Sequence, residues 1–283
     1  MIMSILYKEL RKHHITCTDE KAGKVQDVLF SDRTFKIKYF GVDTSNWLLG
    51  HKVALAEESI EEFRELDHVI NLNIKKSVLE NAPALDEMVP VSRQYEMHVR
   101  DYFGWKPLGA VLSPEMGAWF PYPNYELTSN VGAIPQAQID EWSEIQVHRK
   151  HSFDGHLRSC NELLGYKIAT SDGEHFGEVA DLMIDVVNFQ VIDILISTNR
   201  WLPGGKKFAC SPMFIRSIDE ENKYLNVGLS KDILLNSPEF TLEEYGEDYR
   251  QSLVESYCNV DDSFPSSGAD HRPNSGVSQA GYL

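Results

Sequence analysis

The sequence is poor in cysteine, and the few it has are widely separated. Its 283 residues include four, Cys17, Cys160, Cys210 and Cys258, with no C-x-x-C pair among them. Small secreted domains held by disulfides carry closely spaced cysteines, so this spacing argues against a disulfide framework. We therefore expect a protein of a reducing, cytoplasmic compartment.

Long apolar runs are also missing. No stretch approaches the roughly 18 apolar residues that a membrane-spanning helix requires. The opening residues Met1 to Tyr7 are partly apolar but have no basic residues before them and no small-residue cleavage site after them. We expect neither a membrane span nor an export signal.

Basic residues are outnumbered, with 27 lysines and arginines against 43 acidic residues and a formal net charge of −16. Such a charge repels phosphate backbones, so nucleic acid is not an expected partner. It would attract a basic protein surface, although its first effect is on solubility. Hydrophobic residues make up 42% and charged residues 25%, which is normal for a folded globular chain.

What the sequence does contain is an internal repeat. A shift of 154 residues superimposes matching residues at turns, apolar positions and one aspartate, and repeats of this kind indicate a duplicated fold. The matched pairs are Gly23/Gly177, Val25/Val179, Asp27/Asp181, Phe35/Phe189, Thr44/Thr198, Trp47/Trp201, Leu48/Leu202, Gly50/Gly204 and Lys52/Lys206.

One residue inserted near Gly205 in the second copy changes the shift to 155. Beyond it, identical residues continue into a segment that ends in proline, which stops a helix. These pairs are Asn71/Asn226, Lys76/Lys231, Leu79/Leu234, Asn81/Asn236 and Pro83/Pro238.

Within each copy the apolar pattern is that of short strands. In the second copy Asp172-Gly173 predicts a tight hairpin, and strands are expected over 191–196, 207–210 and 224–229. Ser230 is expected to cap a helix over 231–236, and Thr241 to open a second helix with the stripe Leu242, Tyr245, Tyr249 and Leu253. Val91, Tyr95 and Val99 form the counterpart stripe after the first copy. The expected fold is mainly β with short helices, a tandem duplication of a small β-barrel.

The Gly-x-Val-x-Asp strand, the Trp-Leu-x-Gly turn and the closing helix with Asn-x-Pro resemble the PRC-barrel family. This family includes the cytoplasmic domain of the photosynthetic reaction centre H subunit, and the chain is similar to two-barrel bacterial members. The resemblance implies a non-catalytic adaptor module that docks on other proteins. The expected domains are a first PRC-barrel over 1–85, a helix and connector over 86–156, a second PRC-barrel over 157–240, a C-terminal helix over 241–260 and a disordered tail over 261–283.

The connector is rich in proline, glycine and aromatic residues, above all over 104–127. Aromatic side chains on rigid turns suit a partner surface, because they bury much area at little cost in rotamer freedom. The alternative is that these rings pack against the barrels and hold the copies together. The candidate interaction residues are Trp105, Trp119, Phe120 and Tyr122.

Other residues that could carry chemistry have a simpler structural explanation. His148, His151, His156 and Asp154 are the densest group of metal-ligand types, but Gly155 interrupts any helix there, so no metal site is expected. The segment 203–207 lacks the spacing of a phosphate-binding loop and is expected to be a turn.

Asp27 and Asp181 occupy equivalent places and are expected to accept backbone hydrogen bonds, rather than to transfer protons. Trp47 and Trp201 are expected in the cores.

Two functional hypotheses follow. The first is a non-enzymatic adaptor, without a cofactor, that binds another protein or a second copy of itself through its barrel surfaces. The alternative is a small-ligand binder or enzyme with its site in the cleft between the barrels, because pockets favour domain interfaces. A packed junction between the copies favours the adaptor, and an open cleft with convergent polar groups favours the ligand binder.

Overall fold

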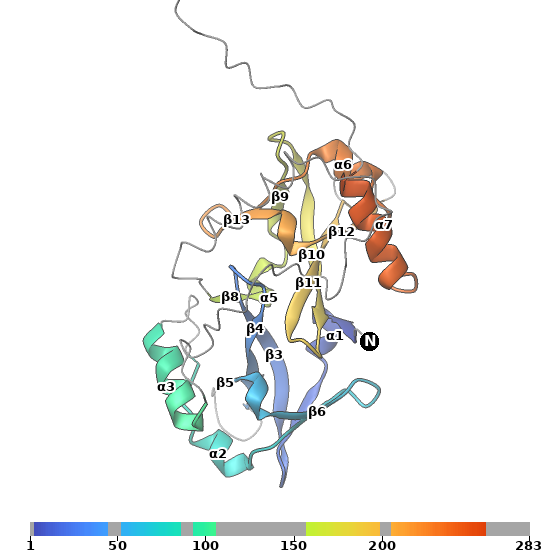
Figure 1. Ribbon diagram of the computed structural model, residues 1–283. Coiled ribbons are helices and arrows are strands. Elements are labelled where there is room, and N and C mark those ends of the chain that lie inside the picture. Colours follow the sequence, from blue (N-terminus) through green and yellow to red (C-terminus); the bar gives the residue numbers. More distant parts are fainter. Residues whose placement is uncertain (1–2, 45–51, 86–92, 106–156, 199–204, 259–283) are drawn as a thin grey trace, which may run out of the picture.

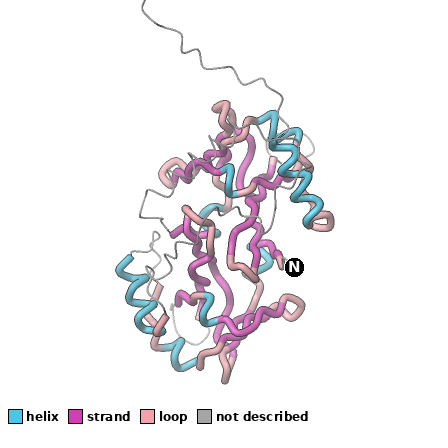
Figure 2. Tube along the Cα trace, viewed as in Figure 1, coloured by secondary structure: helices cyan, strands magenta, loops and turns pink. Residues whose placement is uncertain are grey.

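The computed structural model describes residues 3–44, 52–85, 93–105, 157–198 and 205–258. These residues form two β-sheets with short helices around them (Figures 1 and 2). The expected mainly β fold with short helices is confirmed. Below, "first half" means residues 3–105 and "second half" means residues 157–258.

The first sheet is built almost entirely from the first half. Its strands run in the order β5-β4-β3-β2-β7-β6, and β8 joins from the second half. The elements of the first half are β1 (Ser4–Leu6), α1 (Tyr7–Leu10), β2 (His14–Thr16), β3 (Lys21–Ser31), β4 (Ile37–Asp43), β5 (Lys52–Leu55), η1 (Glu57–Ser59), β6 (Ile60–Arg64), β7 (Val69–Leu72), α2 (Lys76–Glu80) and α3 (Arg93–Phe103).

The second sheet repeats this plan in the order β12-β11-β10-β9-β14-β13, and β1 joins it from the first half. The elements of the second half are β8 (Leu157–Ser159), α5 (Cys160–Leu163), β9 (Lys167–Ala169), β10 (His175–Asp185), β11 (Gln190–Ser197), β12 (Lys207–Cys210), η2 (Pro212–Phe214), β13 (Ile215–Asp219), β14 (Tyr224–Val227), α6 (Lys231–Asn236) and α7 (Glu247–Cys258). In both sheets one pair is parallel, β2 with β7 and β9 with β14.

Two glycines of the repeat are required by close backbone contact. Gly23 has φ +154°, and a Cβ there would lie 2.2 Å from the carbonyl oxygen of Asp43. Gly177 has φ +130°, and its Cβ would lie 2.4 Å from the carbonyl oxygen of Ser197. A Cβ atom does not fit at these distances. Both halves therefore require glycine at this position of the long strand, where the backbone of the neighbouring strand comes close.

In both halves an aspartate holds the start of the short helix that follows the last strand. The backbone amide of Lys76 donates to Asp19 (2.9 Å), and that of Lys231 donates to Asp172 (3.2 Å). Both aspartates lie in the turn before the long strand β3 or β10. A carboxylate at this position satisfies an amide that the first turn of a helix leaves unpaired.

Several local predictions are confirmed. Gly173 has φ +79° in the predicted hairpin turn. Strand β12 spans the predicted residues, and Ser230 accepts a hydrogen bond from the amide of Ile233 at the start of α6. Of the predicted turn over 203–207, Gly205 and Lys206 precede β12 and Lys207 already belongs to the strand, whereas Pro203 and Gly204 lie outside the described residues.

Two predictions are corrected. The helix expected from Thr241 begins at Glu247 instead, because Gly246 and the turns before it delay the helix, and Leu242 is 53% exposed rather than part of a buried stripe. The pairing of Lys52 with Lys206 is also corrected, since Lys52 lies opposite Asp43 as Lys207 lies opposite Ser197, and the inserted residue therefore comes before Lys207. The structural counterpart of Lys52 is therefore Lys207.

The larger hydrophobic core is continuous across the two halves. A single cluster of buried side chains contains residues of both sheets, of α1 and of α5. A smaller cluster, formed by Leu29, Tyr39, Ala54, Ala56, Val99 and Leu157, lies between the first sheet and α3. In the described ranges, no helix is long and apolar enough to cross a membrane.

Candidate functional site

Each half contributes its first strand to the sheet of the other half. β1 pairs antiparallel with β10, with Ser4 opposite Asp185 and Leu6 opposite Met183. β8 pairs antiparallel with β3, with Leu29 opposite Ser159. Figure 1 shows β8 beside β3 and β4, and α1 beside β10 and β11. Each sheet is therefore completed by a strand from the other half, and residues 1–85 contribute to both sheets.

Asp27 holds the segment that the second half contributes. Its Oδ2 accepts a hydrogen bond from the hydroxyl of Ser159 (2.5 Å), and its Oδ1 accepts one from the amide of Asn161 (3.1 Å) at the start of α5. The hydroxyl of Tyr7 and the amide of Val28 also donate to Oδ1, at 3.0 and 2.8 Å. The carboxylate thus links β3 to α1 and α5.

Asp181 holds α1, which the first half contributes, against the second sheet. Its Oδ1 accepts hydrogen bonds from the amide of Lys8 in α1 (3.2 Å) and from the amide of Leu182 (2.9 Å). Burial raises the pKa of Asp181, while the two amides act in the opposite direction. The backbone hydrogen bonds expected for Asp27 and Asp181 are confirmed, and both aspartates hold the short helix that the opposite half contributes.

The hairpins β3–β4 and β10–β11 also cross at the junction between the halves. The amide of Ile37 donates to the carbonyl of Phe189 (2.8 Å), and the amide of Val191 donates to the carbonyl of Phe35 (2.9 Å). Phe35 and Phe189 have φ of +55° and +49°. A bulky residue rarely adopts this left-handed conformation, which costs about 1–3 kcal/mol. Here the left-handed conformation turns the carbonyls of Phe35 and Phe189 toward the opposite half.

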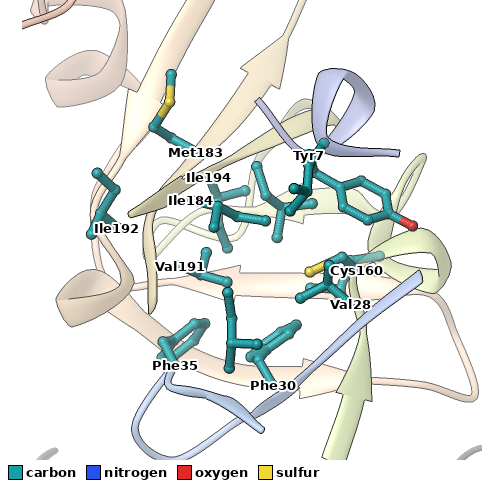
Figure 3. Packing of buried hydrophobic residues seen from close by; sticks show 14 of the residues in the cluster. Tyr7, Val28, Phe30, Phe35, Cys160, Met183, Ile184, Val191, Ile192 and Ile194 are labelled. Atoms are coloured by element: carbon teal, nitrogen blue, oxygen red, sulfur yellow. The ribbon is translucent and has the colours of Figure 1, made fainter. Parts of the chain in front are cut away.

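Apolar side chains fill the space behind these hydrogen bonds (Figure 3). Phe30 and Phe35 stack with ring centroids 5.4 Å apart, and Val191 lies above them from the second half. Phe40 meets Phe189 edge to face at 6.0 Å. All of these except Phe189 are at most 3% exposed. The described part of the junction is therefore a packed core.

Tyr7 and Cys160 begin α1 and α5 and are both fully buried. Burial raises the pKa of both groups, and the carboxylate of Asp27 raises it further. A thiol must lose its proton to act as a nucleophile, so this environment favours an inert cysteine. Cys17, Cys160 and Cys210 are all buried free thiols.

Ion pairs and polar contacts surround the packed junction. Arg158 of β8 is only 9% exposed, and its guanidinium lies 3.1 Å from the carboxylate of Asp32 and also contacts Glu220. Lys36 donates to the carbonyl of Asn188 at 2.9 Å. The contacts of Arg158 with Asp32 and of Lys36 with Asn188 join the two halves.

Of the predicted interaction residues, Trp105 lies in the described structure. It is partly buried against the smaller core cluster and stacks on Phe103 with ring centroids 4.3 Å apart. The guanidinium of Arg100 lies 6.0 Å from its ring. Trp119, Phe120 and Tyr122 lie outside the described residues, as do Trp47 and Trp201.

The histidine-rich segment with His148, His151, Asp154 and His156 also lies outside the described residues. Within the described residues, no group of three or more histidine, cysteine, aspartate or glutamate side chains is placed to hold a metal ion.

Comparison with known families agrees with this architecture over part of the chain. Residues 156–234 match the family model of the PRC-barrel domain. This region is a PRC-barrel domain. No curated protein matches the chain. The domain begins with β8 and α5, which dock on the first sheet, and ends within α6. The PRC-barrel domain thus gives its first strand to the other half and takes β1 in return.

A buried ion pair joins the PRC-barrel domain to α7, which follows it in the chain. Asp193 lies in the fully buried strand β11, and its Oδ2 is 3.6 Å from Nε of Arg250 and 2.5 Å from the hydroxyl of Tyr245. Burial raises the pKa of Asp193 to about 6. Tyr257 donates to the carbonyl of Ala209 next to it. These contacts fasten α7 to the outer face of the second sheet.

An open recess of about 590 Å³ lies in the first half, away from the junction. It is lined by Cys17, Thr18, Glu61, Glu62, Asn71 and Leu72. Burial raises the pKa of Cys17 to about 11, so the thiol is neutral. The recess was not foreseen from the sequence, because its walls come from β6, β7 and the loop after β2, whose arrangement only the structure gives.

The exchange of strands was also missed at the sequence level. The repeat was followed only from Gly23 and Gly177 onward, whereas α1 and α5 precede those glycines. A weak signal exists, since Leu10 and Ile15 correspond to Leu163 and Ile168 one residue out of register. Sequence equivalence, however, does not tell to which sheet a short preceding strand belongs.

Proposed function

We propose that the first half is a second PRC-barrel and that the tandem works as a non-catalytic adaptor that binds other proteins. The strand order of the two sheets is the same, which supports a duplicated domain. Left-handed residues at equivalent places add to this, namely Phe35 with Phe189 and His68 with Lys223. A relationship to the reaction centre H subunit stays a prediction.

The observation that carries the proposal is that the polar groups of the junction bond to groups of the protein itself or are buried. Asp27 and Asp181 accept hydrogen bonds from the backbone that they anchor, and Cys160 is a buried thiol with a raised pKa. A proton-transfer or nucleophilic site needs such groups near solvent and near substrate. Here they hold the halves together, which leaves the outer surface of a rigid unit as the part that acts.

The buried free thiols support a reducing, cytoplasmic setting. The packed junction supports the adaptor over a ligand site between the barrels, because apolar side chains fill the described part of it and the carboxylate of Asp27 is bonded to groups of the protein.

The test is photo-crosslinking of the full chain inside its native cells. A photo-reactive phenylalanine analogue replaces Leu66 or Val187, which are 98% and 56% exposed at two hairpin tips, or the exposed Leu242. We expect at least one position to give an adduct of defined mass with a protein, and excess unlabelled wild-type chain to suppress it. The buried Val28 serves as the matched control and should give no intermolecular adduct.

Absence of any protein adduct at all three exposed positions would contradict the adaptor. The ligand-binding alternative is tested on the same protein by thermal shift with a metabolite library. A single compound that raises Tm in proportion to the logarithm of its concentration, without protein adducts, would favour that alternative.

A further inference from the structure

The recess in the first half is shaped by a β-bulge. Ile60 pairs with Leu72 and Glu62 pairs with Asn71, so Glu61 is an extra residue on β6. A bulge changes the alternation of side chains and re-aims them. As a result both Glu61 and Glu62 line the recess, and Glu62 accepts a hydrogen bond from Asn71 (3.0 Å).

The second half has the same bulge with different side chains. Ile215 pairs with Val227 and Ser217 pairs with Asn226, so Arg216 takes the place of Glu61. Asn226 donates to Ser217 (2.8 Å), as Asn71 does to Glu62. The backbone geometry is therefore equivalent, while the charge is reversed.

Arg216 is the extra residue of this bulge, and its side chain lies against the neighbouring strand end. Its side chain lies over Gly228, where an added Cβ would be 3.0 Å from its Nε and 3.7 Å from its Cγ. Gly228 directly follows Val227, the counterpart of Leu72 in the wall of the recess. The second half thus carries a cation at the bulge, where the first half carries the carboxylate of Glu61.

We propose that the recess of the first half binds an arginine side chain of a basic segment in a protein partner. This inference rests on the proposed adaptor function and names the chemistry of the partner. A guanidinium between the carboxylates of Glu61 and Glu62 gains charge-assisted hydrogen bonds. The neutral thiol of Cys17 and the buried Leu72 provide apolar contact for the stem of the side chain.

The surroundings of the recess support the same partner. In the described residues β6 pairs only with β7, so its other edge is open to an extended segment. Two cations of the first half already have carboxylate partners, since Lys76 lies 2.8 Å from the carboxylate of Glu20 and Arg64 lies 2.5 Å from that of Asp67. The net charge of −16 steers a basic segment toward the protein.

The test measures binding of a fluorescein-labelled hexa-arginine peptide to the full chain by fluorescence anisotropy. The variant Glu61→Gln/Glu62→Gln removes the two carboxylates, and Glu243→Gln/Glu247→Gln removes two exposed carboxylates from the other half as the matched control. All four residues are exposed, so both variants should keep the wild-type Tm.

We expect the wild type to bind, the Glu61/Glu62 variant to bind about tenfold more weakly, and the control to stay within about twofold of the wild type. Glu61→Arg, which introduces the residue of the second half, should weaken binding at least as much. A hexa-lysine peptide should bind more weakly than hexa-arginine, because an ammonium cannot make the paired contacts of a guanidinium.

Equal losses in the Glu61/Glu62 variant and the control would overturn the proposal, since attraction would then come from the overall charge. No binding by the wild type, no loss in the Glu61/Glu62 variant, or equal binding of hexa-lysine would overturn it too. These outcomes are independent of the crosslinking result. If crosslinking gives protein adducts but the Glu61/Glu62 variant binds the peptide as the wild type does, the adaptor function stands and this site does not. If the peptide binds as expected but no protein adducts form, the adaptor function itself is contradicted.

Discussion

Equivalent residues of the two halves keep the same backbone and use different chemistry. His68 and Lys223 both have left-handed φ, at +50° and +58°. Lys223 donates to Glu162 (2.8 Å) and to the hydroxyl of Tyr166 (3.0 Å). In the first half the counterpart of Tyr166 is His13, whose ring stacks on Phe63 at 4.8 Å and meets His68 edge-on at 5.0 Å. A polar triad in one half is thus an aromatic cluster in the other.

This difference predicts a pH dependence for His13. Burial lowers its pKa below 6.5, helped by the neighbouring His68, while Glu65 and the carbonyl of Glu9 act in the opposite direction. The unfolded chain therefore binds a proton more readily than the folded chain does. The stabilising contribution is complete above pH ~6.5 and is lost as pH falls through the lower folded pKa.

The measurement is urea unfolding at pH 8 and at pH 5. Replacing His13 by Phe, which keeps the ring stacked on Phe63, should reduce the fall in unfolding free energy between the two pH values. The exposed neighbour His14, replaced by Gln, is the control and should keep the wild-type difference. An unchanged difference in the His13→Phe variant would show that His13 is not the titrating group.

A second prediction at this scale compares the two anchoring aspartates. Asp27 accepts four hydrogen bonds and Asp181 accepts two. Bonds to a charged group contribute about 1.5–3 kcal/mol each at most, and their contributions overlap. Asp27→Ala should lower the unfolding free energy by about 2–4 kcal/mol and Asp181→Ala by about 1–2 kcal/mol in chemical denaturation. The reverse order would contradict this reading of the junction.

At the scale of elements, the helices that follow the two sheets, α3 and α7, are held by ion pairs of different kinds. α3 contributes Arg100, which lies 2.8 Å from the carboxylate of Glu58 at the rim. α7 contributes Arg250, which is 4% exposed and faces the fully buried Asp193. A buried ion pair costs much desolvation, and removing one partner leaves the other charge uncompensated. The attachment of α7 is therefore the more sensitive of the two.

Removing the cation of this pair should have a large effect. Arg250→Met should lower the unfolding free energy by about 3–5 kcal/mol near neutral pH. Asp193 has a folded pKa of about 6, above its ordinary 3.8, so its ionisation opposes folding as pH rises from about 4 to 6. The loss in Arg250→Met should therefore shrink in acid.

Urea unfolding at pH 5 and pH 8 measures this effect. The double variant Asp193→Leu/Arg250→Met, with neither charge, is the control and should recover most of the stability without the pH dependence. A double variant as unstable as Arg250→Met would show that packing of Arg250, rather than its charge, holds α7.

The elements also show what the sequence could and could not foretell. Asp172-Gly173 and Ser230 were placed correctly, because turns and helix caps depend on neighbouring residues. The helix start at Thr241 was wrong, since Gly246 lies between this residue and the helix, and Thr241 instead donates to the carboxylate of Glu244 (3.2 Å). The strand exchange and the recess depend on contacts between residues far apart in the chain, and local patterns carry no information on those.

At the scale of the whole molecule, we expect the two halves to unfold as one cooperative unit rather than as two independent domains. Each sheet contains a strand of the other half, and one apolar cluster spans both. Contacts that are shared in this way are lost together, so partial unfolding of one half exposes the core of the other.

Cutting the chain between the halves tests this directly. A protease site inserted after residue 130, outside the described residues, allows cleavage of the folded full chain. The two fragments should stay together and elute from a sizing column as one particle of unchanged size, because β1 and β8 still complete the opposite sheets. Adding denaturant should separate them in the same transition that unfolds the uncut chain. Separation in buffer alone would show that the halves do not depend on each other.

The crossed strands also bear on how the protein is made. During translation β3 leaves the ribosome more than a hundred residues before β8, the strand that completes its edge. Until Ser159 and α5 have been synthesised, the edge of β3 that pairs with β8 is open, and Asp27 lacks two of its four hydrogen bonds. Folding of the first half must therefore wait for the second, and a chaperone that shields the edge of β3 during this interval should raise the yield of native protein.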